Sequence, residues 1–167
     1  MSGVPGRLTG RRAESLDNNR GTFIGGPQVR RPLARFVKVS QQELDSVRKL
    51  YESVMSYACH GLFFREGMVL AEELTKSLAL GEDPLEAGKK VILERGWAEE
   101  VAFTDSGARV RGSIEAMPGG DVETCHRLRG ILSKLLEAKT KHRVRLAEVE
   151  CVSTGGRECV FEQEGGA

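Results

Sequence analysis

The sequence contains no apolar run that approaches the roughly 18 residues of a membrane-spanning helix. No apolar segment follows Arg11 and Arg12 to complete an export signal, so we expect a cytoplasmic protein. No Gly-x-Gly-x-x-Gly motif follows an expected strand, and no Ser-His-Asp or paired-carboxylate arrangement can be identified. The sequence therefore predicts neither a membrane span nor catalytic residues.

The charge is distributed unevenly along the 167 residues. Residues 1–35 carry a net charge of +5, so the remaining residues carry −4, because the whole chain sums to +1. Residues 1–34 are rich in Gly, Pro and Arg and contain Phe23 as their one aromatic residue, so we predict a flexible basic arm that does not bind nucleic acid. We expect residues 35–164 to form one domain, since the chain is too short for two comfortable cores.

Two cysteines flank a predicted turn near the C-terminus. The glycine pair Gly155-Gly156 indicates a hairpin with a three-residue loop, Gly156 in the left-handed position and Cys151 directly opposite Cys159. Opposed residues on one face of a sheet have Cβ atoms about 5 Å apart, close enough for two thiolates to bind one ion. A cross-strand disulfide is the alternative, and an intracellular location disfavours it.

Cys125 provides a third sulfur. Pro118–Asp121 resembles a loop ending in an N-cap, which would place Cys125 in the first turn of a helix, where the helix dipole favours the thiolate. Buried cysteines also occur as ordinary core residues. Three sulfur ligands at this spacing favour a metal site, and soft ligands favour zinc.

The fourth ligand stays open from geometry alone. On a straight strand Glu148 and Cys151 face opposite sides, so a bulge near residues 149–150 would be needed to bring them together. Glu148, Glu150, His126 and water are the alternatives.

The elements alternate in a pattern typical of an α+β domain. We expect an antiparallel sheet of about five strands with helices packed on one face. The expected strands are residues 35–40, 97–104, 108–116, 144–151 and 157–162, and the expected helices are residues 40–55, 62–80, 85–95 and 121–138.

Several local features refine this prediction. Ser40 and Glu43 form a capping box, Asp83 and Pro84 begin the third helix, and Gly96 ends it. Gly67 allows another backbone or a ligand to approach its helix closely. We interpret Cys59 as a packed core residue beside a half-exposed His60. One face of the first helix is expected to be buried: Leu44, Val47, Leu50, Tyr51, Val54 and Met55.

The cysteine motif also resembles a known family. Cys125-His126-x3-Gly130, followed by Glu148-x2-Cys151-x3-Gly155-x3-Cys159-x-Phe161, is similar to the signature of the vinyl-4-reductase (V4R) domain family. This resemblance implies a fold shared with the small subunits of the TRAPP tethering complex and with haem-based nitric-oxide sensors. Sensor domains of phenol-responsive transcription activators in this family hold zinc with three Cys and one Glu. The resemblance therefore implies Glu148 as the fourth ligand of a structural zinc.

The resemblance also implies a ligand and a homodimer. Family members bind small apolar molecules between helices and sheet, and the candidate lining residues in this chain are Phe63, Phe64, Met68, Trp97, Phe103, Ile114 and Leu132. A zinc-containing sensor of an apolar or aromatic molecule is the first functional hypothesis. A scaffold or adaptor subunit with a protein partner, resembling TRAPP components, is the alternative. Reduction of a tetrapyrrole vinyl group ranks behind both, because hydride chemistry requires a cofactor site that the sequence lacks.

Overall fold

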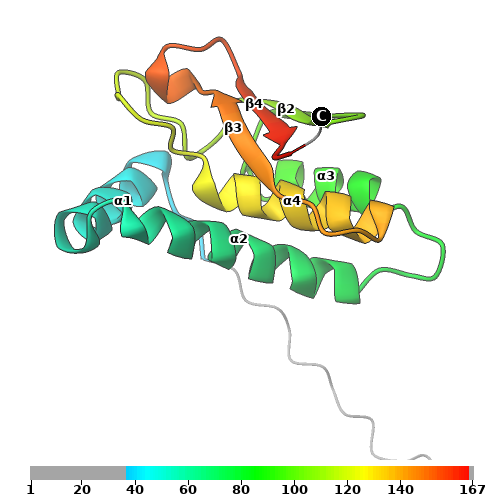
Figure 1. Ribbon diagram of the computed structural model, residues 1–167. Helices are drawn as coiled ribbons and strands as arrows, with labels where there is room; N and C mark the ends of the chain where they lie inside the picture. The colour runs from blue at the N-terminus through cyan, green and yellow to red at the C-terminus, as the bar shows by residue number, and fades with distance from the viewer. Residues whose placement is uncertain (1–36, 166–167) are drawn as a thin grey trace, which may run out of the picture. The chain divides into compact units, whose positions relative to one another are not determined.

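Four helices, four strands and one 3-10 helix make up residues 37–165, which are the residues that the computed structural model describes (Figure 1). In chain order the elements are α1 (Gln41–Met55), α2 (Ala58–Lys76), α3 (Pro84–Glu94), β1 (Glu100–Thr104), β2 (Gly107–Arg111), α4 (His126–Thr140), β3 (Leu146–Glu150), η1 (Val152–Thr154) and β4 (Cys159–Gln163). The predicted arm at residues 1–34 lies outside the described residues. No helix within the described part is long and apolar enough to span a membrane.

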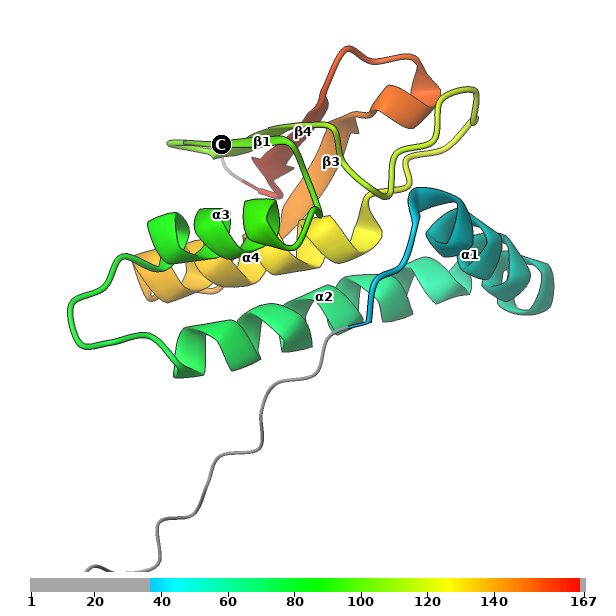
Figure 2. The ribbon, with the colours of Figure 1, turned by 180° about the vertical axis from the view of Figure 1, so that it is seen from behind.

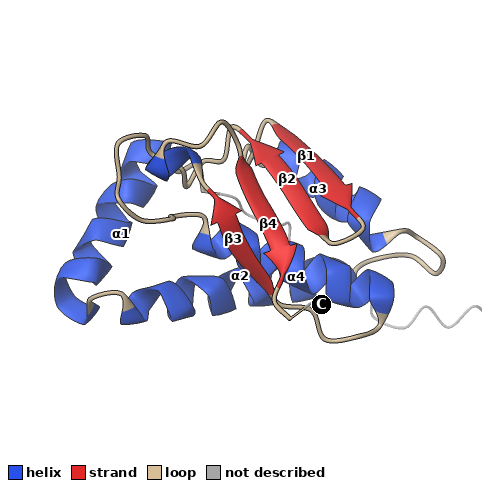
Figure 3. Ribbon diagram, turned by 45° about the horizontal axis from the view of Figure 1, so that its top comes forward, coloured by secondary structure: helices blue, strands red, loops and turns tan. Residues whose placement is uncertain are grey.

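The sheet is antiparallel throughout, with strand order β1-β2-β4-β3 (Figure 3). The predicted α+β class is confirmed, with four strands in the described residues where about five were expected. The expected strand at residues 35–40 is the difference: residues 35–36 lie outside the described part, and Val37–Ser40 form no strand. The side chains of Val37 and Val39 are exposed, so neither alternating apolar residue finds a sheet to cover.

The helices cover one face of the sheet, as predicted. Figures 1 and 2 show α3 and α4 directly against the sheet and α2 on the far side of α4. Nine of the fifteen residues of α4 are buried, because this helix is covered by the sheet on one side and by α2 on the other. The core joins leucines of α4 to apolar residues of every strand, among them Leu128, Leu132, Leu135, Val101, Val110, Leu146 and Phe161.

Two glycines allow α2 and α4 to touch backbone to backbone. A Cβ at Gly67 would collide with the carbonyl group of Arg127, and a Cβ at Gly130 would collide with the carbonyl group of Phe64. The predicted close approach at Gly67 is therefore confirmed, and its partner is the backbone of α4. The glycine of the cysteine motif, Gly130, has the reciprocal role.

Capping residues set several boundaries where the sequence places them. The Ser40 hydroxyl accepts a hydrogen bond from the Glu43 N–H at 3.2 Å, and the Glu43 carboxylate accepts one from the Ser40 N–H at 2.8 Å. Asp83 caps α3 with Pro84 at its first position, and Gly96 follows the helix with φ 68°. The predicted capping box and both ends of α3 are confirmed.

The first two strands of the sheet are shorter than predicted. The expected segments 97–104 and 108–116 form a regular ladder over β1 and β2 alone. Gly112, with φ 61°, interrupts the second segment, and isolated hydrogen bonds from Glu99 to Arg111 and from Ile114 to Trp97 continue the pairing. A left-handed residue cannot continue a regular strand, so the ladder stops there.

The helix α1 departs most from prediction. Its apolar face was expected to be buried, yet Leu50 is 62% and Val54 is 76% exposed, and Val47, Tyr51 and Met55 are exposed as well. The one buried residue of α1 is Asp45. The helix lies at one end of the domain, beside the start of α2 and away from the sheet (Figure 2). The apolar residues of α1 therefore form a face that is largely exposed on the described part of the chain.

Candidate metal centre and apolar cavity

Four side chains converge near the start of α4: one lies at that helix, and the other three lie in the segment from Glu148 to Cys159. Cys125 is the N-cap residue of α4, Glu148 lies on β3, Cys151 precedes η1 and Cys159 begins β4. Their ligand atoms all lie within 4.8 Å of one another. The Sγ atoms of Cys125 and Cys159 are 3.4 Å apart, and those of Cys151 and Cys159 are 3.9 Å apart. None of the four cysteines forms a disulfide, so the alternative cross-strand bridge is not present.

A β-bulge brings Glu148 to the cluster. Glu148 pairs with Phe161 and Glu150 pairs with Val160, so Val149 is the additional residue on β3. Because side chains alternate along a strand, one extra residue turns Glu148 and Cys151 to the same side. The bulge that the sequence required near residues 149–150 is confirmed.

The turn between the last two cysteines differs from the predicted loop. Residues 152–154 form the 3-10 helix η1, and Gly155, with φ 94°, takes the left-handed position that was assigned to Gly156. Gly156 closes the turn in a different way, because its N–H donates to the Cys151 carbonyl at 2.8 Å and a Cβ there would press against that carbonyl. The turn holds Cys151 beside Cys159 all the same.

The start of α4 also differs from prediction, because acidic side chains far away in sequence cap this helix. The helix begins at His126, so Cys125 precedes the first turn and Asp121 is not the N-cap. The Cys125 N–H donates to Glu148 Oε2 at 3.1 Å, and the Leu128 N–H donates to Glu115 Oε2 at 2.8 Å. Local pattern could not reveal these long-range caps.

The sulfur atoms have hydrogen-bonding partners beyond the cluster. Ser113 Oγ lies 3.2 Å from Cys125 Sγ, and the Ser153 N–H donates to Cys151 Sγ at 3.4 Å. Ser153 is itself fixed by Thr124, with 2.5 Å between the two hydroxyl oxygens. Hydrogen bonds to thiolate sulfur orient ligands and stabilise their charge, as partners outside the coordination sphere do in metal sites.

Burial and contact between the ligand groups raise the pKa values of three of the four side chains in the cluster. Burial raises the pKa of Glu148 to about 9, and the charge of Cys151 adds to the effect. Contact with Cys151 and Cys159, together with burial, raises the pKa of Cys125 well above its usual value. Hydrogen bonding to Cys125 lowers the pKa of Cys159, but contact with Cys151 and burial outweigh it and raise this pKa to about 12.

Cys151 is the exception in the cluster. Hydrogen bonds from Cys125 and then Cys159 lower its pKa far below the usual value of a thiol. These directions favour the thiolate form of Cys151 and the protonated forms of Cys125, Cys159 and Glu148 when no ion is bound. A cation at the centre would displace those protons, because metal ligands bind in their deprotonated forms.

The arrangement fits a tetrahedral ion. Zinc–sulfur bonds of about 2.3 Å at tetrahedral angles place sulfur atoms about 3.8 Å apart, and the observed sulfur separations of 3.4 and 3.9 Å lie on either side of that value. Glu148 Oε1 is buried and has no hydrogen-bond partner among the described residues. A buried, unpartnered carboxylate oxygen beside three sulfur atoms is the donor that a metal ion would satisfy.

The other candidate ligands lie elsewhere. Glu150 is exposed, and its carboxylate accepts from the Arg157 N–H at 2.9 Å. His126 is not part of the cluster of ligand atoms, and its ring stacks on His60 with ring centroids 3.9 Å apart. Burial, with neighbouring His60, Arg129 and Arg48, lowers the pKa of His126 to about 3, so its imidazole is neutral.

Cys59 and His60 take the structural roles that the sequence indicated. Cys59 is fully buried and donates to the Ser56 carbonyl at 3.0 Å. His60 is partly buried and bonds to Glu52 at 2.7 Å. Neither reaches the cysteine cluster.

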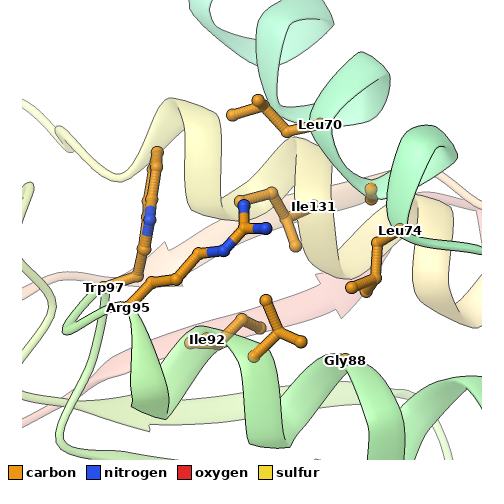
Figure 4. Close-up of a pocket in the computed structure, with 9 residues that line it drawn as sticks. Leu70, Leu74, Gly88, Ile92, Arg95, Trp97 and Ile131 are labelled. Atoms are coloured by element: carbon orange, nitrogen blue, oxygen red, sulfur yellow. The ribbon is translucent and has the colours of Figure 1, made fainter. Parts of the chain in front are cut away.

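A second feature is an apolar cavity where α2, α3 and α4 meet, with about 330 Å³ of space including the part open to solvent (Figure 4). Its lining consists of apolar side chains, one glycine and one arginine: Leu70, Ala71, Leu74, Gly88, Val91, Ile92, Arg95, Trp97 and Ile131. The cavity therefore lies between helices, and Trp97 is the one predicted lining residue that borders it.

The six other predicted lining residues are spread through the domain. Phe63 is buried, with the Arg127 guanidinium 4.1 Å from its ring centroid, and Phe64 lies under the Arg129 guanidinium at 5.0 Å. Leu132 is fully buried in the core, which Phe103 joins from β1. The remaining two, Met68 and Ile114, are partly buried. A ligand contact at these six residues stays a prediction.

A buried ion pair that no local sequence pattern reveals lies at the first turn of α4. Glu115 and Arg127 are both buried and lie 3.3 Å apart, and Arg127 Nε also donates to Glu66 at 2.7 Å. Burial raises the pKa of Glu115 to about 7, although hydrogen bonds from Leu128 and the charge of Arg127 act against it. A glutamate among apolar residues at the end of an expected strand is the signal that could have marked it.

Comparison with known proteins relates the chain to one family. Residues 108–164 match the sequence model of the V4R domain. No curated protein sequence matches the chain. The solved phenol-responsive sensory domain of the transcription activator PoxR, in a crystal structure with phenol, is similar with a TM-score of 0.62 and 18% identity, over 78% of this chain and 77% of that chain.

A vinyl-4-reductase family protein from Methanocaldococcus jannaschii is similar with a TM-score of 0.54 and 17% identity, over 78% of this chain and 83% of that chain. At these identities the likeness to both structures concerns the fold. The matched segment contains Cys125, Glu148, Cys151 and Cys159. The resemblance found in the cysteine motif is thus confirmed over residues 108–164, which are similar to the V4R domain.

Proposed function

We propose that the protein is a zinc-containing domain that binds and senses a small apolar molecule. The observation that carries the proposal is that one helix, α4, begins at the Cys3Glu cluster and also provides a wall of the apolar cavity. The similar PoxR domain is described as phenol-responsive, and its structure contains phenol. A related fold with an apolar cavity supports the same class of function here.

Zinc is the ion that this donor set favours. Three thiolates and one carboxylate form a soft, tetrahedral set, whereas magnesium and calcium prefer oxygen ligands. Four protein ligands leave no position for a reacting water, so the ion has a structural role. Zinc would fasten the segment from Cys151 to Cys159 to the start of α4.

The bound molecule is expected in the cavity between α2, α3 and α4. Ligand sites are concave and largely apolar, and this cavity is both; its space of about 330 Å³ includes the part open to solvent, so it is an upper limit on the size of a ligand. A single aromatic ring is therefore a more suitable ligand than a polycyclic one. Trp97 provides an aromatic surface on which such a ring can pack.

The open face of α1 supports self-association. Val47, Leu50, Tyr51, Val54 and Met55 form an exposed apolar stripe. Helices of about 15 residues are marginal in water unless an apolar face is packed, and α1 buries one residue, Asp45. Two copies related by a two-fold axis would pack this stripe against itself, which is the commonest form of homodimer. The proposed assembly is a dimer with α1 at its interface.

Native mass spectrometry of the full-length protein, purified without a tag, tests these proposals together. The expected species is a dimer with one zinc ion per chain and an additional organic mass. A metal-free folded protein would overturn the zinc assignment, and a monomer at micromolar concentration would overturn self-association. Zinc without a retained ligand, and without thermal stabilisation by phenol or other single-ring compounds, would favour the scaffold alternative over a sensor.

A pair of cysteine variants isolates the structural role of the metal. Cys151→Ser is expected to lose the zinc and to lower the melting temperature markedly, because binding energy at a structural site is folding energy. Cys59→Ser is the matched control: this cysteine is equally buried but lies outside the cluster and bonds to the Ser56 carbonyl. It should retain full zinc content. Equal metal content in the two variants would refute the site.

A further inference from the structure

The helix α1 is held to the described domain by directed contacts more than by burial. Asp45 is the one buried residue of α1, and its carboxylate pairs with Arg48 and Lys49 of the same helix. Near the start of α1, the Gln41 side-chain amide donates to the Ala116 carbonyl at 2.8 Å. A helix that buries so little apolar surface takes its position from contacts of this kind.

Two more contacts join the end of α1 to the start of α2. The Glu52 carboxylate and His60 Nε2 form a hydrogen bond of 2.7 Å. Two bonds from Arg48 to Glu52, at 2.7 and 2.9 Å, fix the orientation of that carboxylate. The Tyr51 ring meets the Phe63 ring edge to face, with centroids 5.7 Å apart. His60 and Phe63 are therefore the residues of α2 that hold α1.

Both of these α2 residues contact the first turn of α4. The His126 ring stacks on His60 with centroids 3.9 Å apart, and the Arg127 guanidinium lies 4.1 Å from the centroid of the Phe63 ring. The ring nitrogens of His126 have no hydrogen-bond partner among the described residues, so stacking is the directed contact of this ring. Figures 1 and 2 show α1 at the end of the domain where α4 begins.

The contact at Ala116 leads to the same turn. Ala116 follows Glu115, whose carboxylate accepts from the Leu128 N–H at 2.8 Å and from the Arg127 N–H at 3.3 Å. Cys125, the candidate metal ligand, directly precedes this turn. The three contacts of α1 thus all lead to the turn of α4 that follows the metal cluster.

A displacement of this turn would weaken the three contacts together. Hydrogen bonds lose strength steeply as their distance and angle change, and ring contacts depend on the separation of the rings. An ion that binds Cys125 together with Glu148, Cys151 and Cys159 would fix the start of α4 against β3 and β4. Without the ion, the thiols offer weak hydrogen bonds in its place.

We propose that zinc at the Cys3Glu cluster controls the docking of α1, and through α1 the self-association of the chain. This inference rests on the proposed zinc site and the proposed dimer, and it adds the regulation of that dimer by the metal. Coupling between two binding events is reciprocal, so self-association must also strengthen the binding of zinc.

The first measurement is the zinc affinity of the full-length protein, by competition with a chromophoric chelator. It is made at protein concentrations below and above the dissociation constant of the dimer, which sedimentation velocity provides. We expect zinc to bind about ten-fold more tightly to the dimer than to the monomer, within the usual range of coupling between two sites. This comparison uses zinc-loaded, folded protein, so it holds even if the metal-free chain unfolds. Equal affinities at the two concentrations would overturn the coupling.

A pair of histidine variants assigns the coupling to the contacts of α1. His60→Ala removes both the stack on His126 and the hydrogen bond to Glu52, and it leaves the four candidate ligands in place. It should keep one zinc per chain, weaken the dimer about ten-fold and make the zinc affinity independent of protein concentration. His142→Ala is the control, because His142 is exposed and bonds to Thr140 through its backbone. It should behave like the wild type.

Hydrogen exchange followed by mass spectrometry reports the docking of α1 directly. Amides of α1 should exchange faster in zinc-loaded His60→Ala than in the zinc-loaded wild type, because an undocked helix opens locally. Unchanged exchange in α1 would overturn the inference even if the dimer weakens.

The outcomes separate this inference from the proposals on which it rests. A chain that binds no zinc would overturn the metal assignment and this inference together, and a chain that stays monomeric would do the same for the dimer. Zinc binding and dimerisation that are both present but independent of each other would overturn this inference alone.

Discussion

The contact between α2 and α4 provides the sharpest test of the fold. Gly67→Ala adds one methyl group to a buried position on α2, where the ideal Cβ would collide with the carbonyl group of Arg127 on α4. The added methyl group is bonded directly to the α2 backbone and the carbonyl group belongs to the α4 backbone, so no side-chain rotation can relieve the collision. Relief requires that α4 move away from α2, and α4 is the most deeply buried helix of the described domain.

The same helix provides a matched control. Gly61 also lies on α2, but its side is exposed and no atom lies within 4 Å of an added Cβ. Replacing glycine by alanine inside a helix stabilises it by up to about 1 kcal/mol, a gain common to both substitutions. Overpacking a core contact costs about 1–3 kcal/mol. The two variants should therefore differ by about 2 kcal/mol in the free energy of unfolding, with Gly61→Ala more stable than the wild type.

Urea unfolding followed by circular dichroism measures this difference. For a domain of this size, 1 kcal/mol corresponds to about 4 °C in melting temperature, so the variants should melt about 8 °C apart. The slope of the urea dependence should stay the same in both, since neither substitution changes the surface exposed on unfolding. If Gly67→Ala is as stable as Gly61→Ala, the two backbones do not touch at this point and the packing described for α2 and α4 is wrong.

Two further predictions concern ionisation. Zinc binding at pH 7 should release about three protons, from Cys125, Cys159 and Glu148, because burial and crowding raise the pKa of each above 7. Glu148→Gln should release about two, as measured by calorimetry in buffers of different ionisation enthalpy, and equal counts would contradict a protonated Glu148. Burial raises the pKa of Glu115 from 4.5 to about 7, so the folded protein holds a proton that the unfolded chain has released between these pH values. The stability from this proton is complete below pH 4.5 and is lost as the pH rises to about 7. The stability advantage of the wild type over Glu115→Gln should shrink over that range by up to about 3 kcal/mol, and an advantage that grows in urea titrations would refute the reasoning.

The Cys3Glu cluster was predictable from the sequence because most of it is local. Cys151 and Cys159 are brought together by one turn, and the bulge at Val149 follows from the requirement that Glu148 face the same side as Cys151. The start of α4 was not accessible. Asp121 is a good N-cap by residue type, but Glu115 accepts from the Leu128 N–H in the first turn and Glu148 accepts from the Cys125 N–H just before it. A pattern within the helix contains no information about a cap that comes from another part of the fold.

The first helix shows a second limit. Its apolar residues recur with the period of a helix, and this period correctly predicts a helix with one apolar face. It does not specify what covers that face. A stripe such as Leu50, Tyr51 and Val54 has the same spacing whether it packs on the core of its own chain or on another molecule, and here it is exposed on the described domain.

The motif and the cavity depend on different residues of the same helix. The cysteines fix where α4 begins, and Gly130 presses α4 against α2, so the motif determines the position of the helix. Ile131 comes directly after Gly130 and borders the cavity, so a fixed α4 gives a fixed wall. Trp97, the aromatic residue of the cavity, lies outside the motif, after the end of α3. Chains with the same cysteine pattern can therefore share the position of α4 and still differ in the lining of this cavity.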